Sequence, residues 1–440
     1  MQQVRAFFRQ SGSRFLWTAA VLFCAALLPE YAVPVLCLAA YIAVFRRSRF
    51  SLTALEKTLL LFVWWAAVGI VYSHSRTTAL VIIGQWLLFM PLLFLTRETV
   101  DSRQKLDALF LCGALSGGAA GGIGILQMVS YHVFPALGKW FNPFWHFLDM
   151  GAAKLFFRVL PFAAERLPRQ QFISIQTRAS GTFTNPVFFA CFLCMTLPLC
   201  VHGVLFFRTR SLRIVSLVCL ILCVGGIASS YSRGPYLVLV VVFAVLLLYG
   251  RRYAWKLLCG GAGLLALVAV FAGGVFRRLL TIFNIHDISV NAHSSIWRAG
   301  FQMLRGHLLF GYGTGIGNVR QVLRDTYHIP QPHAHNLFLE ILLENGLIGL
   351  ALFLAVLVIF LRQMLRLARR SEHGRAAAVT LTASVAALCA CGMTDYVFYG
   401  MKPMAYLLLL LGLSQCAAAI CAAPADAQPE AQEKALETIG

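Results

Sequence analysis

Two histidines and an asparagine, His333, His335 and Asn336, stand directly before an apolar helix and are the residues of this chain best suited to chemistry. An imidazole exchanges a proton near neutral pH and can therefore serve as a general base or acid. The three residues end an arginine-bearing loop and precede Leu337, which places them at a membrane surface. This pattern suggests proton transfer on a lipid-linked anionic substrate. The simpler alternative is a helix start in which Asn336 caps free backbone N–H groups.

Arginines beside predicted helix starts are candidate ligands for phosphate. Arg178 precedes a segment rich in Ser, Thr and Asn at 180–185, and Arg233 is the only cation in the tight turn 229–235. Arg298 lies in a long loop further along the chain. The planar guanidinium group binds phosphate and diphosphate through two parallel hydrogen bonds, and a helix N-terminus also attracts anions. Plain helix capping and contact with anionic lipid headgroups are the alternatives.

Two acidic residues, Glu340 and Glu344, lie four residues apart on the same helix and can orient a histidine or pair with an arginine. The His-x-His spacing has no clustered carboxylate partner in the sequence, so no metal site is predicted and no cofactor is expected. Glycines between 311 and 317 resemble a nucleotide-binding loop only superficially, because no strand–helix–strand unit surrounds them. They predict a conformationally demanding turn instead.

Composition places the chain in the membrane class. Hydrophobic residues make up 59% and charged residues 12% of the 440 residues, with a mean hydropathy of +0.76. Soluble domains are about half apolar and about one quarter charged. We therefore expect an all-α polytopic membrane protein with about twelve transmembrane helices. The apolar segments are 15–28, 31–45, 55–72, 77–95, 108–133, 183–206, 212–229, 235–250, 254–275, 337–361, 376–394 and 403–421.

The distribution of cations predicts the orientation of these segments. Clusters of Arg and Lys occupy the short connections at 46–49, 97–105, 208–213, 251–256 and 362–375, whereas the alternate short connections carry single cations. The positive-inside rule then places both termini in the cytoplasm. Two large loops, about 134–180 and 276–336, fall on the periplasmic side, and each holds six cations against two acidic residues. The formal charge of +20 thus indicates membrane lipids and an anionic substrate, with no nucleic-acid motif.

The chain is organised as one membrane-embedded domain, residues 1–421, followed by a disordered cytoplasmic tail, 422–440. Aromatic residues alternate with cations in 139–162, which predicts one or two helices at the membrane interface. Ionisable residues are nearly absent from the centres of the spans, although transporters usually couple through such groups. A polyprenyl-glycan transporter is therefore less favoured than an enzyme.

The order of several short motifs resembles the O-antigen ligase and O-antigen polymerase family. These are 178–183, 232–234, 297–298, 311–313, 335–340 and 344–346, and the likeness extends from about residue 55 to 415. It is strongest between 229 and 349.

This resemblance implies a metal-independent, inverting glycosyltransferase of the GT-C type. The donor would be a glycan on undecaprenyl diphosphate, at the periplasmic face of a bacterial inner membrane. By the same resemblance, His335 would deprotonate the acceptor hydroxyl, and Arg178 and Arg233, with Arg298 as a further candidate, would hold the diphosphate. His333, Asn336, Glu340 and Glu344 would support them.

O-antigen ligase, with lipid A–core oligosaccharide as the acceptor, is the activity that best fits this resemblance. A polymerase that uses another lipid-linked glycan as acceptor, and a protein O-oligosaccharyltransferase, share the donor. The sequence leaves these alternatives open.

Overall fold

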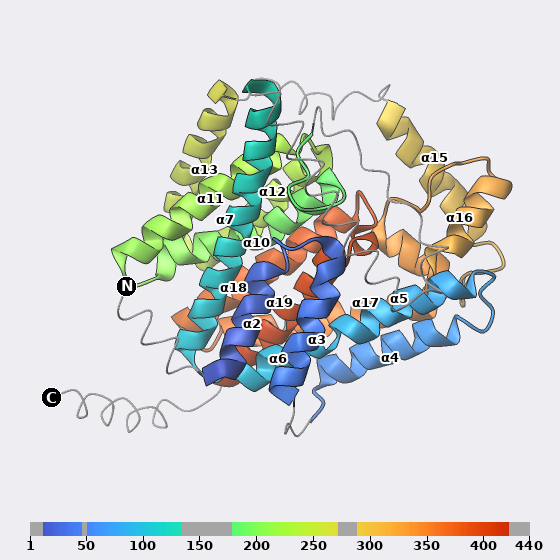
Figure 1. The fold of residues 1–440 in the computed structure, drawn as a ribbon, viewed down its shortest axis with the longest axis horizontal. Coiled ribbons are helices and arrows are strands. Elements are labelled where there is room, and N and C mark those ends of the chain that lie inside the picture. Colours follow the sequence, from blue (N-terminus) through green and yellow to red (C-terminus); the bar gives the residue numbers. More distant parts are fainter. Residues whose placement is uncertain (1–11, 46–50, 134–177, 272–287, 422–440) are drawn as a thin grey trace.

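The computed structural model describes residues 12–45, 51–133, 178–271 and 288–421, and every regular element in these ranges is a helix (Figure 1). The first helices are α2 (Gly12–Cys24), α3 (Val33–Val44), α4 (Ala54–Val68), α5 (Arg76–Phe89), α6 (Pro91–Thr99) and α7 (Arg103–Val133). Then come α10 (Pro186–Phe206), α11 (Arg210–Ser229), α12 (Arg233–Leu246), α13 (Arg251–Phe271), α15 (Ile288–Met303), α16 (Ile316–Asp325), α17 (Leu337–Ala368), α18 (Glu372–Gly392) and α19 (Met401–Ile420). Short 3-10 turns lie at Glu30–Ala32, Leu247–Tyr249 and Val397–Tyr399.

The prediction of an all-helical, polytopic membrane protein is confirmed for the described residues. Each of the twelve predicted apolar segments overlaps a helix in the described residues, and the segment 77–95 spans both α5 and α6. By length and composition, seven helical stretches can cross a membrane, and α5 and α6 together form one of them. The seven are Arg76–Thr99, Arg103–Ser130, Pro186–Phe206, Arg210–Ser229, Leu337–Ala368, Glu372–Gly392 and Met401–Ile420. Gly12–Cys24, Glu30–Val44 and Arg233–Tyr249 are shorter apolar helices.

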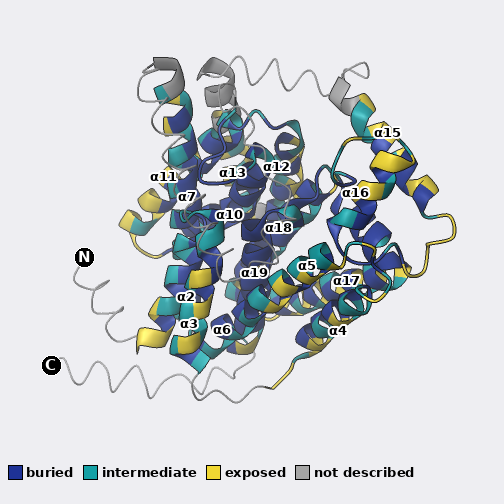
Figure 2. Ribbon diagram, turned by 45° about the vertical axis from the view of Figure 1, so that its right-hand side comes forward, coloured by how far each residue is buried: buried dark blue, intermediate teal, exposed yellow. Residues whose placement is uncertain are grey.

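The centre of the bundle consists of α10, α18 and α19, which are buried along nearly their whole length (Figure 2). The α7 helix packs closely on α11 because small residues line their contact. A side chain at Gly121 would overlap the backbone of Leu222, and one at Gly226 would meet Gly121. Small residues bring membrane helices within direct backbone contact, so van der Waals packing can hold them together without a hydrophobic driving force.

One predicted helix is interrupted. Within α17, Gly346 has a φ of 65° and a ψ of −171°, so the segment from Leu337 to Asn345 is a short helix that precedes the longer span. The backbone N–H of Leu347 donates to Leu308 O at 2.8 Å, and that of Tyr312 donates to Leu343 O at 2.8 Å. Only glycine fits at 346, because any side chain would overlap Leu309 and the φ is left-handed.

The short helices α15 and α16 pack on the beginning of α17 and form a second small core. Its buried residues are Ile296, Ala299, Met303, Val319, Leu323, Ala334, Leu339 and Leu343. The loop that carries His333 and His335 is therefore held between α15 and α17. The predicted turn in the glycine-rich segment is confirmed, since Gly311, Gly313 and Gly315 all have positive φ.

The predicted interfacial helices at 139–162 and the predicted tail at 422–440 lie outside the described residues.

Candidate active site

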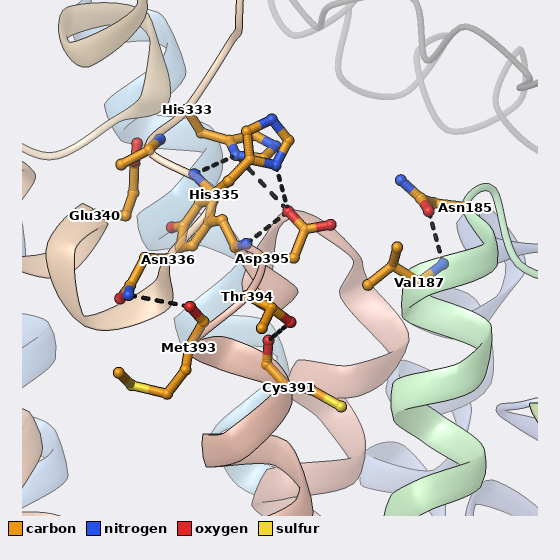
Figure 3. Close-up of polar contacts among 12 residues, drawn as sticks. Asn185, Val187, His333, His335, Asn336, Glu340, Cys391, Met393, Thr394 and Asp395 are labelled. Atoms are coloured by element: carbon orange, nitrogen blue, oxygen red, sulfur yellow. Dashed lines mark hydrogen bonds and ion pairs between the residues drawn. The ribbon is translucent and has the colours of Figure 1, made fainter. Parts of the chain in front are cut away.

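A histidine and an aspartate from distant parts of the sequence meet at one end of the bundle. The Nδ1 atom of His335 lies 3.0 Å from Oδ1 of Asp395, and both side chains are drawn side by side in Figure 3. Asp395 is buried in the turn after α18, whereas His335 is half-buried. A carboxylate at this position holds the imidazole with Nδ1 protonated, which directs Nε2 away from Asp395 as a proton acceptor. The pair thus has the arrangement of an oriented general base.

The charge of Asp395 is maintained by its neighbours. Burial by itself raises the pKa of this carboxyl group, but the hydrogen bond with His335 and the nearby His333 outweigh burial and lower it. The backbone N–H of Tyr396 also donates to Oδ1, at 2.8 Å. Asp395 is therefore ionised at neutral pH and able to stabilise a protonated His335.

His333 is a buried neighbour of this pair and not an equivalent of His335. Its Nδ1 accepts a hydrogen bond from the backbone N–H of His335 at 3.2 Å and lies 3.9 Å from Asp395 Oδ1. Burial lowers the pKa of His333 to about 3, the Asp395 charge opposes this, and the neighbouring His335 and His293 lower it further. His333 is neutral at physiological pH and serves to position the loop.

A third histidine, His293 from α15, completes a cluster of His293, His333, His335 and Asp395, which we call the histidine cluster. The ring centroids of His293 and His335 are 5.1 Å apart. Burial lowers the pKa of His293, as do the charges of His335 and Arg233, whereas Asp395 raises it. Arg233 begins α12, and the next residue, Gly234, packs against Thr394, the neighbour of Asp395.

The loop before α17 is strained and strongly held. His335 has a φ of 48°, a left-handed conformation that costs a non-glycine residue free energy. Glu340 accepts from the backbone N–H of Ala334 at 2.6 Å, and the indole of Trp297 donates to Ala334 O at 3.1 Å. Asn336 caps α17 by accepting from the backbone N–H groups of Phe338 and Leu339. The cap, which the sequence offered as the simpler alternative, is therefore present, and these contacts together hold His335 in its unusual conformation.

Glu340 and Glu344 do not orient a histidine, contrary to one of the two roles that their spacing suggested. Glu340 binds a backbone amide, and Glu344 accepts from the backbone of Gly315. The carboxylate that orients His335 is Asp395, 60 residues further along the chain. Both glutamates lie in the first turns of α17 and are buried. Each contacts a neighbouring loop instead of a histidine.

Arg178 and Arg233 meet at the turn between α11 and α12. Arg178 donates from Nε to Ser230 O at 3.0 Å and from Nη2 to Ser232 Oγ at 2.8 Å. Ser232 directly precedes Arg233, the first residue of α12. A side chain at Gly234 would overlap Thr394, the neighbour of Asp395. The start of α12, where Arg233 lies, is therefore packed against the turn that carries Asp395, and Arg178 lies at the turn before it.

Further contacts hold the segment of Arg178. Gln127 accepts from the backbone N–H groups of Ser180 and Gly181, at 3.2 and 2.8 Å, and Asn185 caps α10. The buried ammonium group of Lys402 donates to Thr182 O at 2.7 Å. This segment is thus tied to α7, α10 and α19, which gives Arg178 a fixed position.

Arg298 is not brought into the cluster. It follows Trp297 on α15, and its side chain is exposed. In the part of the chain that the structure describes, no hydrogen bond or ion pair joins it to the four cluster residues. Consecutive helical residues point about 100° apart, so the face that carries His293 and Trp297 toward the cluster turns Arg298 away.

The sequence-based conclusion that the His-x-His pair lacks a carboxylate partner is wrong. One ligand atom each from His333, His335 and Asp395 lie within 4.8 Å of one another, a grouping that can hold a metal ion. The donor atoms are already engaged, however, since His333 Nδ1 accepts a backbone N–H and Asp395 Oδ1 accepts from His335 and Tyr396. The nearby guanidinium group of Arg233 also disfavours a second cation.

Asp395, His293 and Tyr399 are the site residues that motif reasoning missed. Asp395 was recognisable as an acidic residue at the outer end of an apolar segment, but no spacing rule connected it with His335. The ring of Tyr399 lies 5.4 Å from that of His333. Burial raises the pKa of Tyr399 to about 12, and the positive charge of Arg320 opposes this.

Acidification should destabilise the protein through His333. The pKa of His333 is about 3 in the folded protein, against 6.5 for an unperturbed histidine. Between these pH values the unfolded chain binds a proton at His333 and the folded chain does not. The stabilisation is complete above pH 6.5 and is lost as the pH falls toward 3. Between pH 7 and 5 we expect a loss of about 2 kcal/mol from this group. Thermal unfolding in detergent at both pH values measures it.

A His333→Gln variant should lose less stability than wild type over the same pH interval. His328→Gln, at an exposed position of the same loop region, is the matched control and should keep the wild-type pH dependence. Equal pH dependence in His333→Gln and wild type would show that His333 does not stay neutral.

The fold and this site define a polytopic, all-helical membrane protein with a histidine–aspartate pair and two arginines at one end of its bundle. Residues 217–354 match the family model described as O-antigen ligase, so the resemblance to that family is confirmed. The matched segment contains Arg233, Arg298, His333, His335, Glu340 and Glu344, whereas Arg178 and Asp395 lie outside it. No protein with curated annotation matches the chain.

Proposed function

We propose that this protein is an O-antigen ligase of the GT-C type, formed by residues 1–421, in a bacterial inner membrane. It transfers a glycan from undecaprenyl diphosphate to a hydroxyl group of lipid A–core oligosaccharide at the periplasmic face. The observation that carries the proposal is the His335–Asp395 pair beside the turn of Arg178 and Arg233, with His335 and Arg233 inside the segment that matches the ligase family.

In the proposed reaction, Nε2 of His335 removes the proton from the acceptor hydroxyl. The oxygen of that hydroxyl attacks the anomeric carbon of the donor. The bond from that carbon to the diphosphate breaks, and undecaprenyl diphosphate leaves with both electrons. Asp395 stabilises the imidazolium, and Arg233, with Arg178 beside it, stabilises the charge that develops on the diphosphate. A single displacement inverts the configuration at the anomeric carbon.

His333 Nδ1 and Asp395 Oδ1, two atoms that could bind a metal ion, already accept hydrogen bonds within the protein. This supports a mechanism without a metal ion. The diphosphate is already a good leaving group, so charge neutralisation by arginine is sufficient. Activity should therefore be the same in the presence and absence of a chelator.

Reconstitution of the purified protein with the lipid-linked donor and lipid A–core tests the proposal. A ligase forms glycosylated lipid A–core and releases undecaprenyl diphosphate. A polymerase instead lengthens the carrier-linked glycan without the core acceptor, and a protein O-oligosaccharyltransferase requires a protein acceptor. A transporter forms no glycosidic bond, and that result would refute an enzymatic role.

A further inference from the structure

A polar pocket outside the histidine cluster lies between the start of α5 and the helix α16. Its volume is about 280 Å³, just below the range of roughly 300 to 1,000 Å³ that is typical of small-molecule sites. The polar groups that line it are Ser75, Thr78, Arg320, Gln321, Arg324 and Asp325. The lining contains two guanidinium groups and one carboxylate, so it carries a net positive charge.

The walls of the pocket are held in place by an extensive set of contacts. Asn318 accepts from the backbone N–H of Ser75 at 2.9 Å and donates to Ser73 Oγ at 2.9 Å. The hydroxyl of Thr78 donates to Ser75 Oγ at 2.9 Å. A side chain at Gly317 would overlap Ser75, so glycine allows α16 to approach α5 this closely. The geometry of the two walls is therefore defined without any ligand.

The packing of α16 determines which of its side chains line the pocket. Val319 and Leu323 are fully buried against α15 and the beginning of α17. Arg320 and Arg324 each follow one of these buried residues and both line the pocket. Two like charges four residues apart repel one another on a helix surface. An anion between them would relieve this repulsion and accept paired hydrogen bonds from both forks.

The helix that carries the pocket arginines packs beside the loop of the histidine cluster. Val319 and Leu323 of α16 share the small core with Ala334, the residue between His333 and His335. Arg233, with Arg178 beside it, lies at a different element, the turn between α11 and α12. The protein therefore has two separate pairs of arginines, Arg178 with Arg233 and Arg320 with Arg324. A transferase binds two substrates, so each pair can serve one of them.

We propose that the pocket between α5 and α16 is an acceptor subsite, in which Arg320 and Arg324 bind a phosphate or carboxylate group of the acceptor glycan. This inference rests on the proposed transferase function and adds the chemical class of the acceptor, an anionic glycan. Bound there, the acceptor is held by the helix that packs against Ala334, the neighbour of His335.

The test compares a phosphorylated core oligosaccharide with the same oligosaccharide after phosphatase treatment. For wild type, the KM of the phosphorylated acceptor should be lower by about tenfold or more, because a hydrogen bond to a charged group contributes about 1.5–3 kcal/mol. Arg320→Gln with Arg324→Gln should remove this difference and leave kcat and the KM of the donor unchanged. Arg305→Gln, which removes an exposed arginine of the same loop region, is the control and should behave as wild type.

A lipid headgroup offers the same phosphate chemistry, so the assay is repeated in nanodiscs of neutral and of anionic lipid. An acceptor subsite predicts that the effect of the double variant follows the acceptor phosphate in both lipids. An effect that follows lipid charge alone, or an unchanged KM for the phosphorylated acceptor, overturns the subsite. Absence of transfer by wild type would instead refute the proposed function, and the two failures are therefore distinguishable.

Discussion

Replacing His335 with alanine is expected to lower the rate of glycan transfer by about 10²- to 10⁴-fold, the usual contribution of a general base. The KM of the lipid-linked donor should change little, because the arginines that we propose bind it remain. Asp395→Asn should also lower kcat. The neutral amide cannot stabilise a protonated His335, and it no longer fixes the proton on Nδ1 as the carboxylate does. Single-turnover transfer with the purified variants measures both effects.

The matched control is His328→Ala. His328 is exposed, lies in the same loop region and, like His335, has a left-handed backbone, with a φ of 56° against 48°. Substitution at 328 therefore tests the same change of residue in a similar backbone conformation without touching the cluster. If a stably folded His335→Ala enzyme transfers glycan as fast as wild type, the base is another group and the mechanism is wrong.

Arg233→Gln is expected to lower kcat by about 10²- to 10³-fold, the typical cost of losing one group that stabilises developing negative charge. Arg233→Lys should recover part of this loss, because lysine restores the charge but not the paired hydrogen bonds of the guanidinium group. Arg210→Gln, at the opposite end of α11, is the control and should retain wild-type activity. Release of undecaprenyl diphosphate provides the readout.

Arg178→Gln should give a different phenotype. Two of the donor groups of Arg178 hold Ser230 and Ser232, so its loss displaces the turn that precedes Arg233. We expect a lower melting temperature together with lower kcat, whereas Arg233→Gln should lower kcat alone. Equal effects of the two variants on stability and rate would show that Arg233 also acts through the turn.

Much of the local structure was predictable because it depends on neighbouring residues. Apolar segments long enough to span a membrane became helices, and the Asn336 cap formed from residues two and three positions apart. The glycine-rich turn at 311–317 also followed from local sequence, since positive φ favours glycine.

Contacts across the bundle were not predictable from spacing. The interruption of α17 at Gly346 arises because a loop from residues 308–312 takes over backbone hydrogen bonds there, which an apolar pattern does not reveal. The predicted role of Arg298 at the diphosphate depends on which face of α15 meets the cluster. The face that packs there carries His293 and Trp297, not Arg298.

Local sequence was sufficient to establish the membrane class, the position of the helices and the presence of His335, Arg178 and Arg233 near helix starts. Packing of the whole bundle was needed to pair His335 with Asp395, to place the start of α12 against Thr394 and to open a pocket beside Arg320 and Arg324. The difference arises from the range of the interactions. Hydrophobicity, capping and backbone strain act within a few residues, whereas the pairing of ionisable groups depends on helix packing that joins positions 60 residues apart.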